Sequence, residues 1–278
     1  MRKKTGPTRK LPHMPDPANG PPLAGRTALV TGSSSGVGKG IALELARAGC
    51  SVAVNSHTDA PGVQNTIAEV RALGVDAFAA MGDVGSSADV QRIFEEVLGK
   101  FAKLDILVNN AGVQTWAPLL ELREEDWDRD IRTNLKGCFL CTQAAARHMR
   151  RQSHGAIINI GSACNKIPFP RLISYTASKG GIEMFTKVAA VELGCYGIRV
   201  NCVAPGAILV ERTKAEGGDY EKLWAERAPL GRVGLPADIG QTVVFLASAE
   251  ASYISGQTIY VDGAAFTRPN WPYKTEKT

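Results

Sequence analysis

The chain has 278 residues, of which 44% are hydrophobic and 21% are charged, so it is long enough for one α/β domain, or at most two small ones, with a sizeable core. Its apolar runs span four to six residues, far short of the ~20 that a membrane-spanning helix requires, and the mean hydropathy of −0.07 agrees with a soluble protein. The net charge of +5 includes +4 from residues 1–22, which leaves the rest nearly neutral, without the basic footprint of a nucleic-acid-binding protein.

Residues 1–22 form a basic arm rich in Pro and Gly, which predicts a mobile segment and not a folded element. The arm lacks the apolar stretch of a secretory signal, and the six cysteines are scattered without a disulfide framework. We therefore expect reduced thiols in a cytoplasmic protein. Cys138 and Cys141 match C-x-x-C, but their apolar helical surroundings favour helix packing over zinc or redox chemistry.

From residue 26 onward, short β-branched runs alternate with helical segments. Strands are predicted over residues 27–31, 51–55, 76–81, 105–109, 156–160, 199–204 and 258–262. Helices are predicted over residues 37–48, 63–73, 88–101, 124–152, about 175–196 and 236–248. This alternation indicates right-handed βαβ units and a parallel sheet covered by helices on both faces. Residues 207–235 break the alternation after the carboxyl end of a strand, which predicts a substrate lid.

The segment from Thr31 to Gly38 joins the first predicted strand to the first helix in the pattern G-x-x-x-G-x-G. Glycines permit a tight turn and a close approach of backbone to a phosphate, and a helix N-terminus adds free N–H groups and a positive dipole. The spacing differs from G-x-G-x-x-G, but its place between a strand and a helix favours a dinucleotide site. The candidate phosphate-binding residues are Gly32, Ser34, Ser35, Gly36, Val37 and Gly38.

The end of the second strand bears on the choice of nicotinamide cofactor. An acid there would bind the adenosine 2′-hydroxyl and repel a 2′-phosphate, but the run is Asn55, Ser56 and His57, all able to donate to a phosphate. We therefore favour NADP(H), while NAD(H) stays compatible and His57 keeps the competing interpretation of an ordinary exposed loop residue. Further candidates for the adenine and ribose, after strands three and four, are Asp83, Val84, Asn110, Ala111 and Gly112.

Tyr175 and Lys179 are four residues apart, so a helix would place both on one face. A phenol titrates near pH ~10 in water, and a nearby positive charge would lower its pKa toward neutral pH, as an acid/base requires. Ser162, thirteen residues upstream, could hold the oxygen that gains or loses the proton. Alone, this spacing is equally typical of a surface pair worth a few tenths of a kcal/mol.

Together these motifs, with Pro205-Gly206, occur in the order and spacing of the short-chain dehydrogenase/reductase family, which the chain resembles from residue 23 to residue 266. The resemblance implies a doubly wound, seven-stranded Rossmann sheet, a nicotinamide cofactor and a homotetramer. It also implies that Asn134 holds a water linked to Lys179 in a proton relay, and that Lys179 binds the nicotinamide ribose. Pro205, Gly206 and the backbone of Ile208 would lie beside the nicotinamide.

Two positions depart from the family pattern. Val210 stands where many members carry a threonine whose hydroxyl meets the carboxamide, and Ser35 stands where many NADP-preferring members carry Arg or Lys. The first departure bears on how the nicotinamide is oriented, and the second weakens the preference for NADP(H).

Local motifs leave the substrate open between a sugar, a ketone and an oxoacyl compound. Residues 166–170 look like those of bacterial glucose dehydrogenases, and residues 229–236 occur in many bacterial members, including 3-oxoacyl carrier-protein reductases. We expect the extension at residues 267–278 to fold over the pocket of a neighbouring subunit. The candidate pocket residues are Gln114, Trp116, Cys164, Asn165 and Phe169.

We therefore predict an NAD(P)-dependent oxidoreductase acting on CH–OH and C=O groups. The expected organisation is an arm at residues 1–22, one Rossmann-type domain at residues 23–266 with a lid at about 207–235, and the C-terminal extension. The alternative is a catalytically silent nucleotide-binding regulator or scaffold of the same fold. A metal-dependent hydrolase has little support because the four histidines show no ligand spacing, and neither a membrane nor a nucleic acid is an expected partner.

Overall fold

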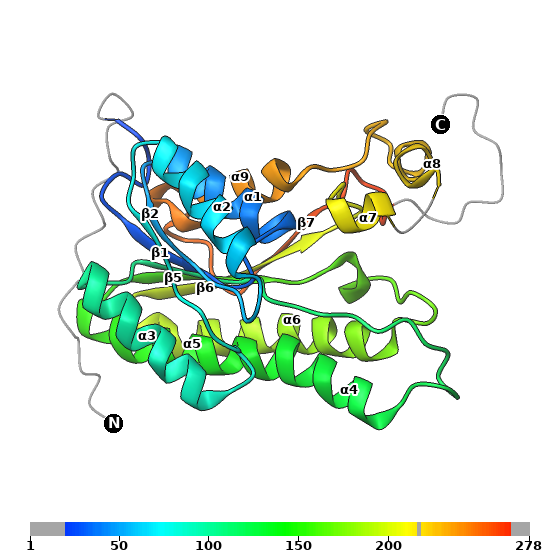
Figure 1. The fold of residues 1–278 in the computed structure, drawn as a ribbon, viewed down its shortest axis with the longest axis horizontal. Helices are drawn as coiled ribbons and strands as arrows, with labels where there is room; N and C mark the ends of the chain where they lie inside the picture. The colour runs from blue at the N-terminus through cyan, green and yellow to red at the C-terminus, as the bar shows by residue number, and fades with distance from the viewer. Residues whose placement is uncertain (1–19, 216–217, 268–278) are drawn as a thin grey trace, which may run out of the picture.

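Seven short strands form one parallel sheet in the part of the chain that the structure, a computed structural model, describes: residues 20–215 and 218–267 (Figure 1). The sheet order is β3-β2-β1-β4-β5-β6-β7, and in the central register Ala28 lies between Val52 and Ile106. The order reverses at β1, which confirms the doubly wound, seven-stranded sheet. The strands are β1 (Thr27–Val30), β2 (Ser51–Val54), β3 (Ala77–Ala79), β4 (Ile106–Asn109), β5 (Gly155–Ile160), β6 (Ile198–Pro205) and β7 (Thr258–Val261).

Helices cover both faces of this sheet, as its continuous apolar strands require (Figure 1). One core cluster joins the sheet to α1 (Gly36–Arg47), α2 (Ala60–Ala72) and α9 (Pro236–Ala247). A second joins the other face to α3 (Ser87–Phe101), α5 (Gly137–Gln152) and α6 (Ile173–Leu193). The sheet is therefore the middle layer of three, and its carboxyl edge is where the connecting turns meet.

The helical segment predicted over residues 124–152 is interrupted. α4 (Glu124–Ile131) continues into a π-helical turn at Arg132–Lys136 before α5 begins. A π-turn carries one extra residue per turn and is often found at functional sites. Sequence periodicity did not reveal it because all three segments follow one another without a break.

The predicted lid contains two helices that the sequence did not reveal, α7 (Glu211–Ala215) and α8 (Tyr220–Arg227). Its two ends are held together: Ile208 forms a parallel bridge with Gly234, and the Gly234 N–H donates to the Ala207 carbonyl at 3.0 Å. The predicted lid is thus a long loop whose two ends are joined to each other. Elsewhere, short 3₁₀ turns occur at Ala163–Asn165, Gly194–Tyr196 and Ala249–Ala251.

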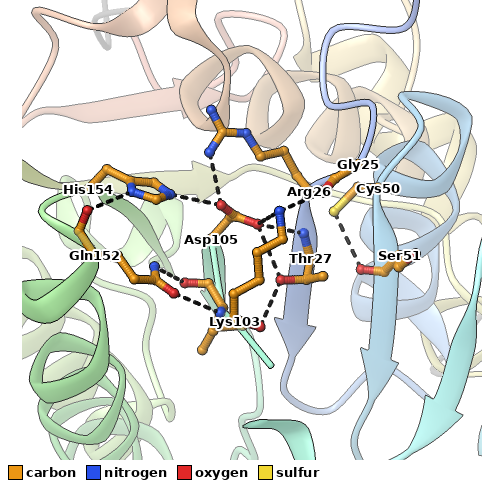
Figure 2. A network of polar contacts seen from close by, with 10 residues as sticks. Gly25, Arg26, Thr27, Cys50, Ser51, Lys103, Asp105, Gln152 and His154 are labelled. Carbon is orange, nitrogen blue, oxygen red and sulfur yellow. Dashed lines mark hydrogen bonds and ion pairs between the residues drawn. The ribbon is translucent and has the colours of Figure 1, made fainter. Parts of the chain in front are cut away.

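At the amino end of the sheet, a network centres on the buried carboxylate of Asp105, just before β4 (Figure 2). Arg26 Nη1 and His154 Nε2 each lie 2.9 Å from Asp105 Oδ1, and the Thr27 N–H donates to Oδ2 at 3.0 Å. Lys103 Nζ lies 3.4 Å from Oδ2. Burial alone would raise the pKa of Asp105, but these hydrogen bonds lower it by more than burial raises it, so the pKa is about 2.

Several predictions concern residues outside the described part. The arm is described only at residues 20–22, and the extension only at Thr267. All six cysteines lie in the described part and are free thiols. Among the described residues, no helix is both long enough and apolar enough to span a lipid bilayer.

Candidate active site

A cavity of about 1130 Å³ opens at the carboxyl edge of the sheet, and the turn between β1 and α1 lines it. Gly32 has a φ of +60°, and a Cβ there would lie 2.7 Å from the Ala111 Cα. A Cβ at Gly38 would lie 2.2 Å from the Gly32 carbonyl oxygen. The turn therefore requires glycine at both positions.

The N-terminus of α1 presents unpaired donors to this cavity. The side chain of its N-cap, Ser35, makes no capping hydrogen bond, and the first turn holds no acidic residue. The first N–H groups and the positive helix dipole thus face the cavity without a side-chain oxygen competing for them. Ser34, Gly36 and Val37 line the same wall. This donor set fits the diphosphate of a nicotinamide dinucleotide.

Asn110, predicted to contact the cofactor, uses its side chain to hold the turn. Its Nδ2 donates to the carbonyl oxygens of Thr31 (3.0 Å) and Gly32 (2.8 Å). The Thr31 hydroxyl in turn accepts from the N–H groups of Asn110 and Ala111, each at 3.0 Å. Asn110, Ala111 and Gly112 line the cavity, and the amide of Asn110 fixes its shape.

Asn55, predicted to contact the cofactor, lines the cavity at the end of β2, and its side chain is also used within the fold. Its side chain is buried, its Oδ1 accepts from the Gly32 N–H at 3.1 Å, and its Nδ2 donates to the Ala80 (2.7 Å) and Gly82 (3.2 Å) carbonyls. Both amide hydrogens are therefore used within the fold, and the side chain cannot donate to a 2′-phosphate. Ser56 and His57 line the cavity beyond it.

Asp83 and Val84 follow β3 and lie on the wall as predicted from their position. Asp83 Oδ1 accepts from the Gly85 N–H at 2.8 Å, and Oδ2 pairs with Arg132 Nη1 at 2.6 Å. Burial raises the pKa of Asp83, and these two hydrogen bonds outweigh it, so the net pKa is lowered. Asp83 is thus an ionised, already paired acceptor at the cavity edge.

Tyr175 and Lys179 both lie on α6 and line the cavity with Ser162, which follows β5. Lys179 is buried, its Nζ donates to the Ile160 carbonyl at 2.7 Å, and Nζ lies 5.5 Å from the centroid of the Tyr175 ring. Burial lowers the pKa of Lys179. Tyr175 and Lys179 therefore face the same cavity from α6, as predicted, and Ser162 lines it with them.

The direction of the Tyr175 pKa differs from the sequence expectation. Burial raises the pKa to about 12, while the hydrogen bond with Ser162 and the charge of Arg212 lower it by less. In the protein alone, the cost of burying a phenolate exceeds the stabilisation that the nearby groups provide. Lys179 by itself therefore does not bring the phenol toward neutral pH.

Asn134 does not line the cavity, because its side chain is used in the fold at the π-turn. Oδ1 accepts from the Val113 N–H at 2.8 Å, and Nδ2 donates to the Val113 carbonyl and to Ser178 Oγ, both at 2.9 Å. A Cβ at Gly112 would lie 3.3 Å from Asn134 Oδ1 and 3.7 Å from Lys179 Nζ. The missing side chain at Gly112 thus leaves Asn134 and Lys179 facing one small gap.

Four of the five predicted pocket residues line the cavity: Gln114, Trp116, Cys164 and Phe169. Asn165 does not. Its side chain turns back to the N-cap of the 3₁₀ turn, where Oδ1 accepts from the Ser162 N–H at 3.3 Å. It therefore positions the backbone of Ser162.

Pro205, Gly206 and Ile208 line the cavity where β6 ends, and so does Val210. The lid was predicted to border the substrate, but the sequence did not single out its wall residues Arg212, Thr213, Tyr220 and Trp224, nor Phe266 at the chain end. Phe169, Trp224 and Phe266 form an aromatic cluster with centroid separations of 5.4–6.4 Å. These residues follow no local motif, because long-range packing alone brings them together.

Comparison with known proteins agrees with this geometry. The family model described as Enoyl-(Acyl carrier protein) reductase matches residues 32–264. The 3-oxoacyl-[acyl-carrier-protein] reductase FabG of Staphylococcus aureus is 43% identical over 87% of this chain and 98% of its own length. The (2S)-[(R)-hydroxy(phenyl)methyl]succinyl-CoA dehydrogenase subunit BbsD of Thauera aromatica is 39% identical over 87% of this chain and 96% of its own.

A solved structure shows the same fold with a cofactor. The gluconate 5-dehydrogenase from Burkholderia cenocepacia J2315, in complex with NADP and tartrate, is 36% identical and superposes with a TM-score of 0.83 over 89% of this chain and 97% of its own. Sequence, fold and site thus agree on an enzyme that transfers a hydride between a nicotinamide cofactor and an alcohol or carbonyl group. The chain belongs to the short-chain dehydrogenase/reductase family of oxidoreductases.

Proposed function

We propose that Tyr175 is the acid/base of this oxidoreductase, that Ser162 positions the reacting oxygen, and that Lys179 binds the cofactor ribose. The observation that supports this assignment is the meeting of all three side chains in one cavity with the glycine-rich turn. Asn134 would complete the proton relay across the gap at Gly112. The Asn134 amide hydrogens are already used, so a relay water would be held by its oxygen atoms.

The chemistry of the residues follows from their protonation states. When bound, the nicotinamide accepts or supplies the hydride. In carbonyl reduction, Tyr175 donates its proton to the oxygen that becomes the hydroxyl, and a neutral phenol, which burial favours, is the form required. In alcohol oxidation, Tyr175 must first be a phenolate, so an additional positive charge close to the phenol is needed.

We infer a preference for NADP(H). Support comes from the end of β2, where Ser56 and His57 line the cavity without a carboxylate among them. The next acid, Asp59, caps α2 by accepting from the Gly62 N–H at 3.0 Å, so its charge is engaged with that helix. The NADP complex of the Burkholderia relative is a further support. Ser35 weakens this preference, because it stands in place of an Arg or Lys that would add a contact to the 2′-phosphate.

Replacing Tyr175 with Phe tests the assignment. We expect Y175F to lose about 10²- to 10⁴-fold in the rate of hydride transfer, the usual contribution of a general acid/base, while NADPH binding persists. Tyr253→Phe, at a fully exposed tyrosine, is the matched control. Near-normal turnover by Y175F would refute the acid/base role. A wild-type protein that binds NADPH and turns over no carbonyl or alcohol would favour the silent nucleotide-binding alternative.

The relatives act on different substrates, so we keep a sugar, a ketone and an oxoacyl compound as candidate classes. Titration of the purified protein with NADPH and NADH identifies the preferred cofactor. A panel of these substrates with that cofactor then separates the three candidate classes. Tighter NADH binding would overturn the cofactor preference.

We also propose that each chain forms one catalytic domain at residues 23–266, with residues 207–235 as its lid. Four such chains would assemble into a homotetramer in the cytoplasm. The support is an exposed apolar face on α5 and α6, formed by Phe139, Met184, Val188 and Val191. Light scattering of the purified protein measures the assembly, and a monomer at micromolar concentration would contradict it.

A further inference from the structure

Three aromatic rings line one part of the cavity, next to the chain segment that carries Ser162. Phe169 meets Phe266 edge to face with centroids 5.4 Å apart, and Trp224 of α8 lies 5.6 Å from Phe266 and 6.4 Å from Phe169. All three residues line the cavity. Ala163, which directly follows Ser162, packs in the same cluster. The aromatic cluster therefore lies against the backbone that positions the serine.

The ring of Phe266 also reaches the part of the cavity where the nicotinamide is expected. A Cβ at Gly206 would lie 3.4 Å from Phe266 Cε2. Phe266 is only 4% exposed, and its N–H donates to Asp262 Oδ2 at 3.3 Å, just after β7. The cluster thus extends from Gly206 toward the lid, and a substrate group attached near the reacting carbon would contact it.

Apolar residues also precede Tyr175. Leu172, the N-cap of α6, is buried three residues before Tyr175 and lines the cavity. It forms a parallel bridge with Ala117, which fixes the loop that carries Trp116. Trp116 lines the cavity too, with more than half of its surface exposed. Both segments that carry a reacting side chain therefore have apolar residues beside them on the wall.

Most polar side chains near these segments are engaged elsewhere or face solvent. The Asn165 carbonyl accepts from the backbone N–H at the N-cap of its own turn, and Arg129 Nη1 pairs with Asp126 Oδ1 at 2.8 Å. The two charged wall residues of α7 are exposed to solvent. Gln114 adds one amide to the wall, which cannot serve the several hydroxyls of a sugar at once. The wall beside the reacting groups therefore fits an apolar group better than a polyol.

We propose that the aromatic cluster binds an apolar group of the substrate, so that the enzyme acts on carbonyl compounds or alcohols carrying a compact apolar group, such as an aryl ring, in preference to sugars. The inference rests on the proposed function, because it requires the reacting oxygen to lie at Ser162 and Tyr175. The apolar group would lie a few bonds from the reacting carbon, since the cluster begins one residue after Ser162. Aromatic walls bind such groups by burying their surface and by edge-to-face contacts.

The test compares two ketones that share one methyl carbonyl, 4-phenyl-2-butanone and 4-hydroxy-2-butanone. The full-length protein is used with NADPH or NADH, whichever binds more tightly. We expect the wild-type protein to prefer the phenyl ketone by about 10- to 100-fold in kcat/KM, the range for burying one aromatic ring.

Trp224→Ala should lower this ratio about 3- to 10-fold by slowing the phenyl ketone, while kcat/KM for the hydroxy ketone changes little and shows that the variant is folded. W224F keeps a ring and should keep most of the preference. Leu223→Ala is the matched control, because Leu223 is exposed on the same helix and does not line the cavity, so the ratio should not change. Equal or better use of the hydroxy ketone by the wild-type protein, or an unchanged ratio in W224A, would overturn the inference while turnover upholds the proposed function.

A binding measurement separates the inference from the proposed function. 3-Phenylpropanamide has the shape of the phenyl ketone but no reducible carbonyl, and 3-hydroxypropanamide is its polar counterpart. The first should raise the melting temperature of the cofactor-loaded wild-type protein more than that of W224A, and the second should raise neither. If no alcohol or carbonyl compound turns over and 3-phenylpropanamide still binds through Trp224, the apolar site stands and the proposed function falls. Absence of both turnover and binding overturns both.

Discussion

The two ends of the sheet bury charged groups in opposite ways. At the amino end, the Asp105 carboxylate lies beside Arg26, Lys103 and His154 and accepts from a backbone N–H, and its pKa falls to about 2, so the charged form is favoured (Figure 2). At the carboxyl end, burial shifts Tyr175 and Lys179 toward their neutral forms, with the phenol reaching a pKa of about 12.

The difference lies in how far each charge is compensated. Asp105 ties β4 to the start of β1 and to His154 at the start of β5, so its charge contributes to holding three neighbouring strands in place. Within the described part of the chain, Lys179 donates one hydrogen bond, to the Ile160 carbonyl, although its ammonium can donate three. A buried charge whose hydrogen-bond donors are only partly used costs stability, and its remaining donors are available to a ligand. We therefore expect the amino end to serve stability and the carboxyl end to serve chemistry.

Replacing Lys179 with Met should separate these roles most clearly. We expect K179M to lose about 10²-fold or more in kcat, because both the proposed ribose contact and the charge beside Tyr175 disappear. The melting temperature should stay within a few degrees, because removal of a desolvated ammonium offsets the lost hydrogen bond to Ile160. Steady-state kinetics and calorimetry measure the two effects.

Lys187→Met is the matched control, since Lys187 is exposed on the same helix and pairs with Glu183. A K179M protein that unfolds many degrees earlier while keeping its kcat would reverse the roles assigned to the two ends of the sheet.

At the amino end, Asp105→Asn should show the opposite pattern. The substitution keeps the shape but removes the carboxylate charge from beside Arg26, Lys103 and His154, and we expect a loss of about 3 kcal/mol in the free energy of unfolding as the charge-assisted hydrogen bonds are lost. The folded protein should keep its kcat, because the network lies at the far edge of the sheet from the cavity. Denaturant unfolding gives the free energy.

Asp76→Asn provides the comparison, because Asp76 also directly precedes a strand at this edge but is exposed. Equal losses in D76N and D105N would mean that position, and not the buried network, determines the effect.

The Asp105 network should also weaken in acid. Its folded pKa of about 2 lies below the ~3.9 of an unfolded aspartate, so the extra stability is complete above pH ~4 and is lost as the pH falls toward about 2. This difference is worth about 2 kcal/mol. Unfolding measured at pH 6, 4 and 3 should show the gap between wild type and D105N narrowing at the lowest pH. A gap that stays constant would show that the carboxylate charge is not what stabilises this end.

The same contrast explains what the sequence could predict. The strands, the helices that flank the sheet and the turn at Gly32 were predictable because short apolar runs, helical periodicity and glycine spacing are local signals. That Tyr175, Lys179 and Ser162 line one cavity was predictable because their order and spacing match a family motif.

Other features depended on contacts that no local pattern records. Asn55 donates to the turn after β3, Asn165 caps its own 3₁₀ turn, and Trp224 meets Phe266 across 42 positions of the chain only after the lid has folded. The pKa of Tyr175 depended on burial, which the spacing of a tyrosine and a lysine does not reveal.

The smallest expected effect is that of His154→Ala. His154 is half-exposed, and Arg26 and Lys103 remain beside Asp105 when the ring is removed, so we expect a loss of about 0.5 kcal/mol, typical of a solvent-exposed pair. That loss corresponds to a fall of about 1–2 °C in melting temperature for a chain of this size. Activity should not change. A loss as large as that in D105N would instead mean that the contact with His154 alone stabilises this end of the sheet. Arg26 and Lys103 would then contribute little to stability through Asp105.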